Sequence, residues 1–133
     1  WIADYVGELR ARAGAYVWRT LVDSGAVVSN GTDTPVEDVD PLACLAATVT
    51  RRMPDGRAFF PEQCLTREEA LRSYTRAGAV AAHEEDVKGS LTPGKYADIV
   101  VLDRDLRTCA VDEIAQARVL YTIVGGRVAY EAP

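Results

Sequence analysis

The order of apolar and polar residues predicts an α/β arrangement in the first part of the chain. From about Gly7 to Asp23 apolar residues recur at helical spacing, and Gly25 follows, so we expect a helix that ends at a left-handed glycine. The short apolar segment Ala26 to Asn30, closed by Gly31, predicts a buried strand. A helix, a glycine and a buried strand in this order form half of an α/β repeat.

The next segments alternate between turns and helices. Residues 31–35, Gly-Thr-Asp-Thr-Pro, predict a sharp turn, and Pro41 begins a second helix, where the first turn tolerates proline. The stretch from Arg51 to Pro61 is rich in proline and glycine and predicts an irregular loop. Thr66 and Glu69 have the spacing of a capping box, in which each side chain bonds the backbone amide of the other residue. A third helix is therefore expected from Thr66 onwards.

After residue 87 the pattern becomes that of a β structure. Ala97–Leu102 and Arg118–Val124 are β-branched apolar runs, which predict strands. Gly125-Gly126 predicts a two-residue hairpin turn, because both glycines can adopt positive φ. We therefore divide the chain into an α/β part, residues 1–87, and a small β part, residues 88–133.

Composition excludes several classes of protein. The 133 residues, 48% of them hydrophobic, can bury the core of one domain. The 15 basic and 20 acidic residues are scattered, with a net charge of −5, so nucleic acid is not an expected partner. No apolar run approaches the roughly 18 residues of a membrane span and no export signal is visible. These features predict a cytoplasmic protein, although the start at Trp1, directly in a helix-like segment, indicates a cut N-terminus.

The cysteines and large aromatic residues have structural interpretations. Cys44, Cys64 and Cys109 are odd in number and far apart, which predicts reduced thiols rather than disulfides or a cysteine zinc site. Tyr74 and the two tryptophans, Trp1 and Trp18, fit apolar helix faces and are expected in the core.

Asp33 is the candidate for chemistry. It follows the expected strand Ala26–Asn30, so its carboxylate should project from the strand's C-terminal end, where α/β proteins gather ligands and catalytic groups. An aspartate in a turn bounded by glycine and proline is also a common turn former, through bonds from its side chain to the backbone. From the residues alone both interpretations of Asp33 are open.

Several segments resemble, in the same order, elements of the metal-dependent amidohydrolases of the family-3 (YtcJ-like) branch. Residues 31–36, Gly-Thr-Asp-Thr-Pro-Val, resemble the Gly-Ser/Thr-Asp-x-Pro-Val element that ends the last barrel strand. Residues 50–57 are similar to the loop that follows, and residues 65–71 to the next helix. Residues 88–103 resemble the strand-turn-strand found near the C-terminus across amidohydrolases.

The resemblance implies a (β/α)8 barrel of TIM type whose strand ends hold one or two divalent metals, usually zinc. The last-strand aspartate, here Asp33, would bind the metal, accept the proton of the attacking water, or do both. A metal lowers the pKa of its bound water to about 7, so a nearby carboxylate is a sufficient base. The implied reaction is hydrolysis of a carbon-nitrogen bond other than a peptide bond, in a small amide, N-acyl or cyclic amide substrate.

The chain departs from this pattern in what it lacks. A TIM barrel takes about 250 residues, and the chain has a single histidine, His83, and no H-x-H. His83 lies late in the expected helix, among acidic residues. A histidine cation is favourable near a helix C-terminus and beside acidic side chains, so its position needs no metal to account for it. We therefore expect the C-terminal part of an amidohydrolase: residues 1–87 supply the last barrel strand and its flanking helices, and residues 88–133 supply strands of a composite β-sandwich.

This interpretation predicts that the 133 residues alone are inactive and bind no metal, because the remaining barrel and sandwich segments would be needed. Without those segments, the strands of the 133 residues would have unpaired edges, which favour self-association. Arg51, Arg52 and Arg57 could lie over the barrel mouth, but solvated loop arginines are the simpler expectation. The rival interpretation is a non-catalytic α+β interaction module, in which Asp33 only shapes a turn and the C-terminal hairpin provides an association edge.

Overall fold

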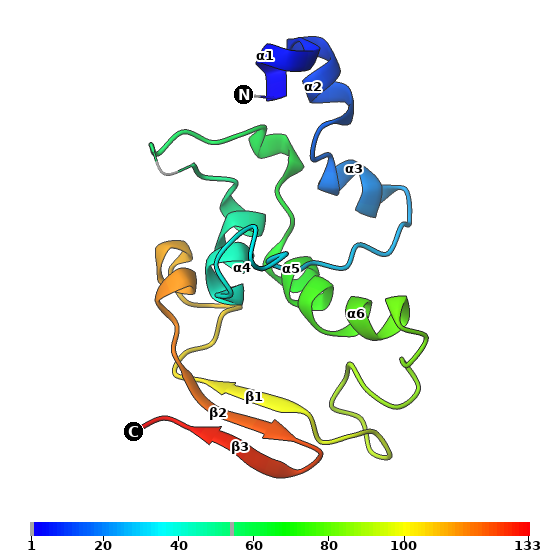
Figure 1. Ribbon diagram of the computed structural model, residues 1–133, viewed down its shortest axis with the longest axis vertical. Helices are drawn as coiled ribbons and strands as arrows, with labels where there is room; N and C mark the ends of the chain where they lie inside the picture. The colour runs from blue at the N-terminus through cyan, green and yellow to red at the C-terminus, as the bar shows by residue number, and fades with distance from the viewer. Residues whose placement is uncertain (1, 54) are drawn as a thin grey trace.

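The structure, a computed structural model, describes residues 2–53 and 55–133. Three short helices lie at one end, a three-stranded sheet lies at the other, and the remaining helices lie between them (Figure 1). The elements, in chain order, are α1 (Ile2–Val6), α2 (Glu8–Gly14), α3 (Trp18–Asp23), α4 (Pro41–Thr50), the 3-10 helix η1 (Pro61–Gln63), α5 (Arg67–Tyr74), α6 (Arg76–Ala81), β1 (Ile99–Leu102), the 3-10 helix η2 (Val111–Gln116), β2 (Val119–Val124) and β3 (Arg127–Glu131).

The single helix expected from Gly7 to Asp23 is wrong, because the segment forms two helices, α2 and α3, with a break between them. The backbone leaves the helical region at Ala15 and adopts a positive φ of 57° at Tyr16. The Tyr16 ring packs edge-to-face on Trp18 and Phe59, with centroid separations of 6.1 and 5.9 Å. The aromatic cluster thus accompanies a break that helical periodicity alone does not predict.

The buried strand expected over Ala26–Asn30 does not form in the part of the chain that the structure describes. The segment has no regular secondary structure and is largely open to solvent, with Val27 62% exposed. Among the described residues its one backbone bond to a segment distant in the sequence runs from Asn30 N to Ser73 O, at 3.0 Å. A strand needs a neighbouring strand to satisfy its backbone groups, and β1, β2 and β3 pair only with one another.

The predicted helix starts at Pro41 and Thr66 are confirmed. The side chain of Asp40 accepts a bond from Leu42 N at 2.9 Å, and Pro41 occupies the first turn of α4. Thr66 and Glu69 form the predicted capping box at the start of α5. The helix that follows is divided at Thr75, where φ and ψ are −122° and −88°, so α5 and α6 are separate.

The core lies between α4, α5 and η2. Its buried members are Leu45, Ala70, Leu106, Ile114 and Ala117, and Ile114 has no exposed surface. These residues come from both sides of the expected boundary at residue 88, and the division into two parts stays a prediction.

The C-terminal β structure is confirmed. The antiparallel sheet has the order β1-β2-β3, with Val100 opposite Thr122 and Thr122 opposite Tyr130. Gly125 and Gly126 both have positive φ in the hairpin turn, as predicted. Within residues 2–53 and 55–133 no helix is both long enough and apolar enough to cross a bilayer.

Gly89 has a conformation and a setting that only glycine fits. Its φ is +85°, and a Cβ there would lie 2.6 Å from the Ala79 Cβ and 3.2 Å from the Arg76 Cα. We expect Gly89→Ala to lower the free energy of unfolding by about 2–3 kcal/mol, through backbone strain and this clash. Gly94→Ala is the matched control, because φ is +93° but nothing lies within 4 Å. Equal losses in the two variants, measured by urea denaturation, would show that the close contact is unimportant.

Candidate functional site

Asp33 lies in the predicted turn with its side chain exposed. Its backbone has φ 55°, and its carbonyl oxygen accepts a bond from Val36 N at 2.8 Å. The hydroxyl groups of Thr32 and Thr34 lie 2.9 Å apart and bond one another. The Asp33 carboxylate makes no hydrogen bond or ion pair with a described residue, so the contacts that close this turn are made by other groups.

Asn30 anchors the segment that leads into this turn. Its backbone N–H donates to Ser73 O at the end of α5, and its Nδ2 donates to Thr48 Oγ1 on α4 at 2.8 Å. Its Oδ1 accepts from Gly31 N at 2.9 Å. Sequence reasoning placed Asn30 only at the end of a strand, because bonds to distant helices leave no local signal.

His83 follows α6 rather than lying within it. It is exposed and has φ 57°. Among the described residues no three side chains of histidine, cysteine, aspartate or glutamate gather in a geometry that could hold a metal ion. Asp33 and His83 are therefore not parts of one preformed cluster. Cys44, Cys64 and Cys109 are all free thiols.

The aromatic residues expected in the core differ in their settings. Tyr74 packs against the core as predicted, and burial raises the pKa of its hydroxyl. Trp18 is 38% exposed and lies instead at the wall of a cavity, and Trp1 lies outside the described residues.

A cavity of about 410 Å³ lies between the N-terminal helices, α4 and the loop that follows α4. Most of its wall is apolar or aromatic. The lining residues are Ile2, Tyr16, Trp18, Asn30, Cys44, Ala47, Thr48, Arg51, Arg52, Met53 and Phe59. Asn30 therefore connects the Asp33 turn to this cavity.

The expectation of solvated loop arginines was wrong for Arg51. Arg51 ends α4 in the left-handed region, with φ 50°, and only 9% of its surface is exposed. Its Nε donates to Phe59 O at 2.6 Å, and its backbone carbonyl accepts from Phe59 N at 2.8 Å. Arg52 and Arg57 are exposed as expected and pair with Asp112 and Asp55 at 2.6 and 2.7 Å.

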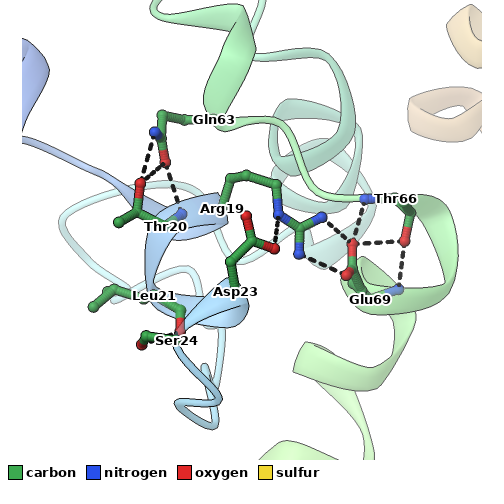
Figure 2. A network of polar contacts seen from close by, with 8 residues as sticks. All are labelled: Arg19, Thr20, Leu21, Asp23, Ser24, Gln63, Thr66 and Glu69. Carbon is green, nitrogen blue, oxygen red and sulfur yellow. Dashed lines mark hydrogen bonds and ion pairs between the residues drawn. The ribbon is translucent and has the colours of Figure 1, made fainter.

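A network of polar contacts joins α3 to the start of α5 (Figure 2). Arg19 donates to both carboxylate oxygens of Glu69, at 2.7 and 2.6 Å, while Glu69 also completes the capping box with Thr66. The Arg19 guanidinium is the largest cause that lowers the pKa of Glu69, to about 2. Thr20 on α3 bonds Gln63 on η1 beside it.

The shifted pKa of Glu69 predicts a dependence of stability on pH. The ion pair stabilises the fold fully above about pH 4.5, and this contribution falls as the pH drops from about 4.5 to about 2. We expect Glu69→Gln, which keeps the capping box, to cost about 1 kcal/mol at pH 7 and less at pH 3. Glu68→Gln is the control, since Glu68 makes an exposed pair with Arg72. A constant cost of Glu69→Gln from pH 7 to pH 3 would contradict the assignment.

The comparisons with known proteins agree on one family. Residues 1–130 match the profile described as Amidohydrolase family. The chain is 34% identical over 125 residues to an N-substituted formamide deformylase of Arthrobacter pascens, covering 94% of this chain and 23% of that protein. It is 29% identical over 134 residues to the putative amidohydrolase YtcJ of Bacillus subtilis (strain 168), covering 98% and 25%.

A solved structure shares the fold. The crystal structure of an amidohydrolase from Thermotoga maritima MSB8 superposes with a TM-score of 0.68 at 19% identity, covering 88% of this chain and 26% of that one. The chain thus spans about a quarter of the length of the proteins it matches. The family resemblance carried by residues 31–36, 50–57, 65–71 and 88–103 is confirmed, and the chain belongs to the amidohydrolase family.

Proposed function

We propose that the chain forms the C-terminal part of a metal-dependent amidohydrolase that hydrolyses non-peptide carbon-nitrogen bonds in small molecules. The family supports the class of reaction, and the deformylase relative acts, by its name, on N-substituted formamides. Residues 1–87 would supply the last strand of a (β/α)8 barrel with its flanking helices, and residues 88–133 strands of a composite β-sandwich. The single observation that carries the role of Asp33 is its exposed carboxylate, which no described residue engages.

In this proposal Asp33 acts as a general base, as a metal ligand, or as both. An ionised carboxylate can accept the proton of a water molecule that attacks the carbonyl carbon, which is what hydrolysis of an amide requires. The turn leaves this carboxylate without a competing donor and fixes its backbone through the bond from Val36 N.

The described residues do not by themselves fit a complete metal site. Asp33 offers one carboxylate, and no cluster of three possible ligands forms around it or elsewhere in residues 2–53 and 55–133. A divalent metal, zinc in our proposal, would need several further His, Asp or Glu ligands from outside these residues. We assign Asp33 as the chain's contribution to such a site.

The first test of this function is a substrate panel given to the full-length protein that carries this chain. The panel contains N-substituted formamides, other N-acyl compounds, cyclic amides and a short peptide. We expect turnover of at least one non-peptide amide and none of the peptide. Turnover of the peptide alone, or of nothing in metal-supplemented buffer, would contradict the proposal.

The rival function, a non-catalytic interaction module, rests on one feature of the sheet. All five residues of β3 are exposed, and β3 is an edge strand. Such an edge can pair with another chain, so self-association stays a prediction of both interpretations. Only the enzyme interpretation requires that turnover depend on Asp33.

A further inference from the structure

The wall of the cavity beside α4 includes a largely buried cation, Arg51, for which no described residue supplies an acidic partner. Arg51 is nine-tenths buried, and no carboxylate of a described residue forms an ion pair with it. Glu62 is close enough to influence Arg51, but it already pairs with Arg12 at 2.9 Å. The Nη atoms of Arg51 are not fully buried, but a side chain that has lost most of its contact with water gains more from an anionic partner than an exposed one does.

The contacts of Arg51 leave most of its donors unused. Of the guanidinium nitrogens only Nε bonds a described residue, through Phe59 O, and the guanidinium carbon lies 5.3 Å from the centre of the Phe59 ring. Burial lowers the pKa of Arg51, yet an arginine stays protonated at any physiological pH. A guanidinium presents paired N–H groups that match the two oxygens of a carboxylate.

The rest of the cavity suits an apolar body. Tyr16, Trp18 and Phe59 provide aromatic walls, and the volume of about 410 Å³ is in the usual range of small-molecule sites. Tyr16 and Arg51, at the wall, and Phe60, next to it, all have positive φ, at 57°, 50° and 48°. Such conformations are costly for large residues and gather at ligand sites.

We propose that this cavity binds a small molecule with an aromatic body and a carboxylate, which pairs with the Arg51 guanidinium. The aromatic body lies against Tyr16, Trp18 and Phe59. We identify this molecule with the substrate, an aromatic amide that also bears a carboxylate, and this identification rests on the proposed function. The binding of such a molecule to the cavity does not depend on the proposed function.

The test compares phenylacetate with its neutral isostere phenylacetamide, by calorimetry on the full-length protein that carries this chain. We expect phenylacetate to bind at least about tenfold more tightly, as a charge-assisted bidentate contact implies. Arg51→Met, which keeps a long apolar side chain, removes this preference. Arg57→Met is the matched control: Arg57 lies in the same loop, is exposed, pairs with Asp55 and does not line the cavity, so the preference stays.

A second variant covers the case in which Arg51→Met fails to fold. Ala47 lines the cavity from an exposed position on α4, so Ala47→Phe fills the space without disturbing the core. We expect it to abolish binding of phenylacetate while the melting temperature stays unchanged. Equal affinity for the two probes, binding of neither, or a preference that survives in a folded Arg51→Met protein overturns the proposal. Affinity is measured without turnover, so a negative result here leaves the role of Asp33 open.

Discussion

We expect Asp33→Asn to reduce kcat of the full-length protein by about 10²–10⁴-fold, the usual contribution of a general base. The amide of asparagine has the size of the carboxylate but cannot accept the proton from water. The loss should appear in kcat as well as in kcat/KM, because proton transfer belongs to the transition state.

The same substitution should leave the melting temperature nearly unchanged. Asp33 is exposed, its φ of 55° lies in the left-handed region that asparagine tolerates well, and its carboxylate bonds no described residue. A loss of turnover can therefore be separated from a loss of fold.

His83→Asn is the matched control for this experiment. His83 is also exposed and also has a left-handed backbone, with φ 57°, so asparagine is tolerated for the same reason. We expect its turnover and metal content to equal those of the unsubstituted protein. Turnover near that level in Asp33→Asn would remove Asp33 from the mechanism, and metal loss in His83→Asn would show that the site lies elsewhere.

The largest effect on stability is expected at Ile114. This side chain has no exposed surface and packs in the cluster with Leu45, Ala70, Leu106 and Ala117. Ile114→Ala should lower the free energy of unfolding by about 2–5 kcal/mol, and Ile114→Val by about 0.5–1.5 kcal/mol, because the cavity left behind grows with the atoms removed. Urea denaturation measures both losses, provided that the m-values of the two variants equal that of the unsubstituted protein.

Leu91→Ala provides the control for Ile114. It removes a side chain of the same size, but Leu91 is 75% exposed, so the loss should stay within about 0.5 kcal/mol. If Ile114→Ala cost no more than Leu91→Ala, the core would not lie where we place it. The same cluster packs against α4, and Thr48 on α4 bonds Asn30. The substitution at Ile114 should therefore also weaken the anchoring of the segment that leads into the Asp33 turn.

The parts of the fold that were predicted correctly depend on neighbours in the sequence. The capping box of Thr66 and Glu69, the proline at the start of α4 and the Gly125-Gly126 turn are each fixed by a few adjacent residues. Local chemistry of this kind can be recognised without knowing the fold.

The parts that were missed depend on distant residues. Tyr16 leaves the helix where it meets Phe59, and Arg51 is buried because Phe59 folds back over the end of α4. A strand over residues 26–30 would need neighbouring strands to bond its backbone groups, and none pairs with it within the described residues. For the candidate site, the sequence predicted the turn around Asp33, but not the cavity or the anchoring by Asn30.

The polar attachment of the N-terminal helices has a consequence for local unfolding. In α1, α2 and α3 only Ala11 is buried. Their contacts with the rest of the chain include the pair of Arg19 with Glu69, the pair of Arg12 with Glu62, the bonds of Thr20 with Gln63 and the aromatic cluster. Regions with few buried apolar contacts open at a lower free energy than the core. Since Tyr16 and Trp18 form one wall of the cavity and α4 forms another, each such opening also removes one wall of the cavity.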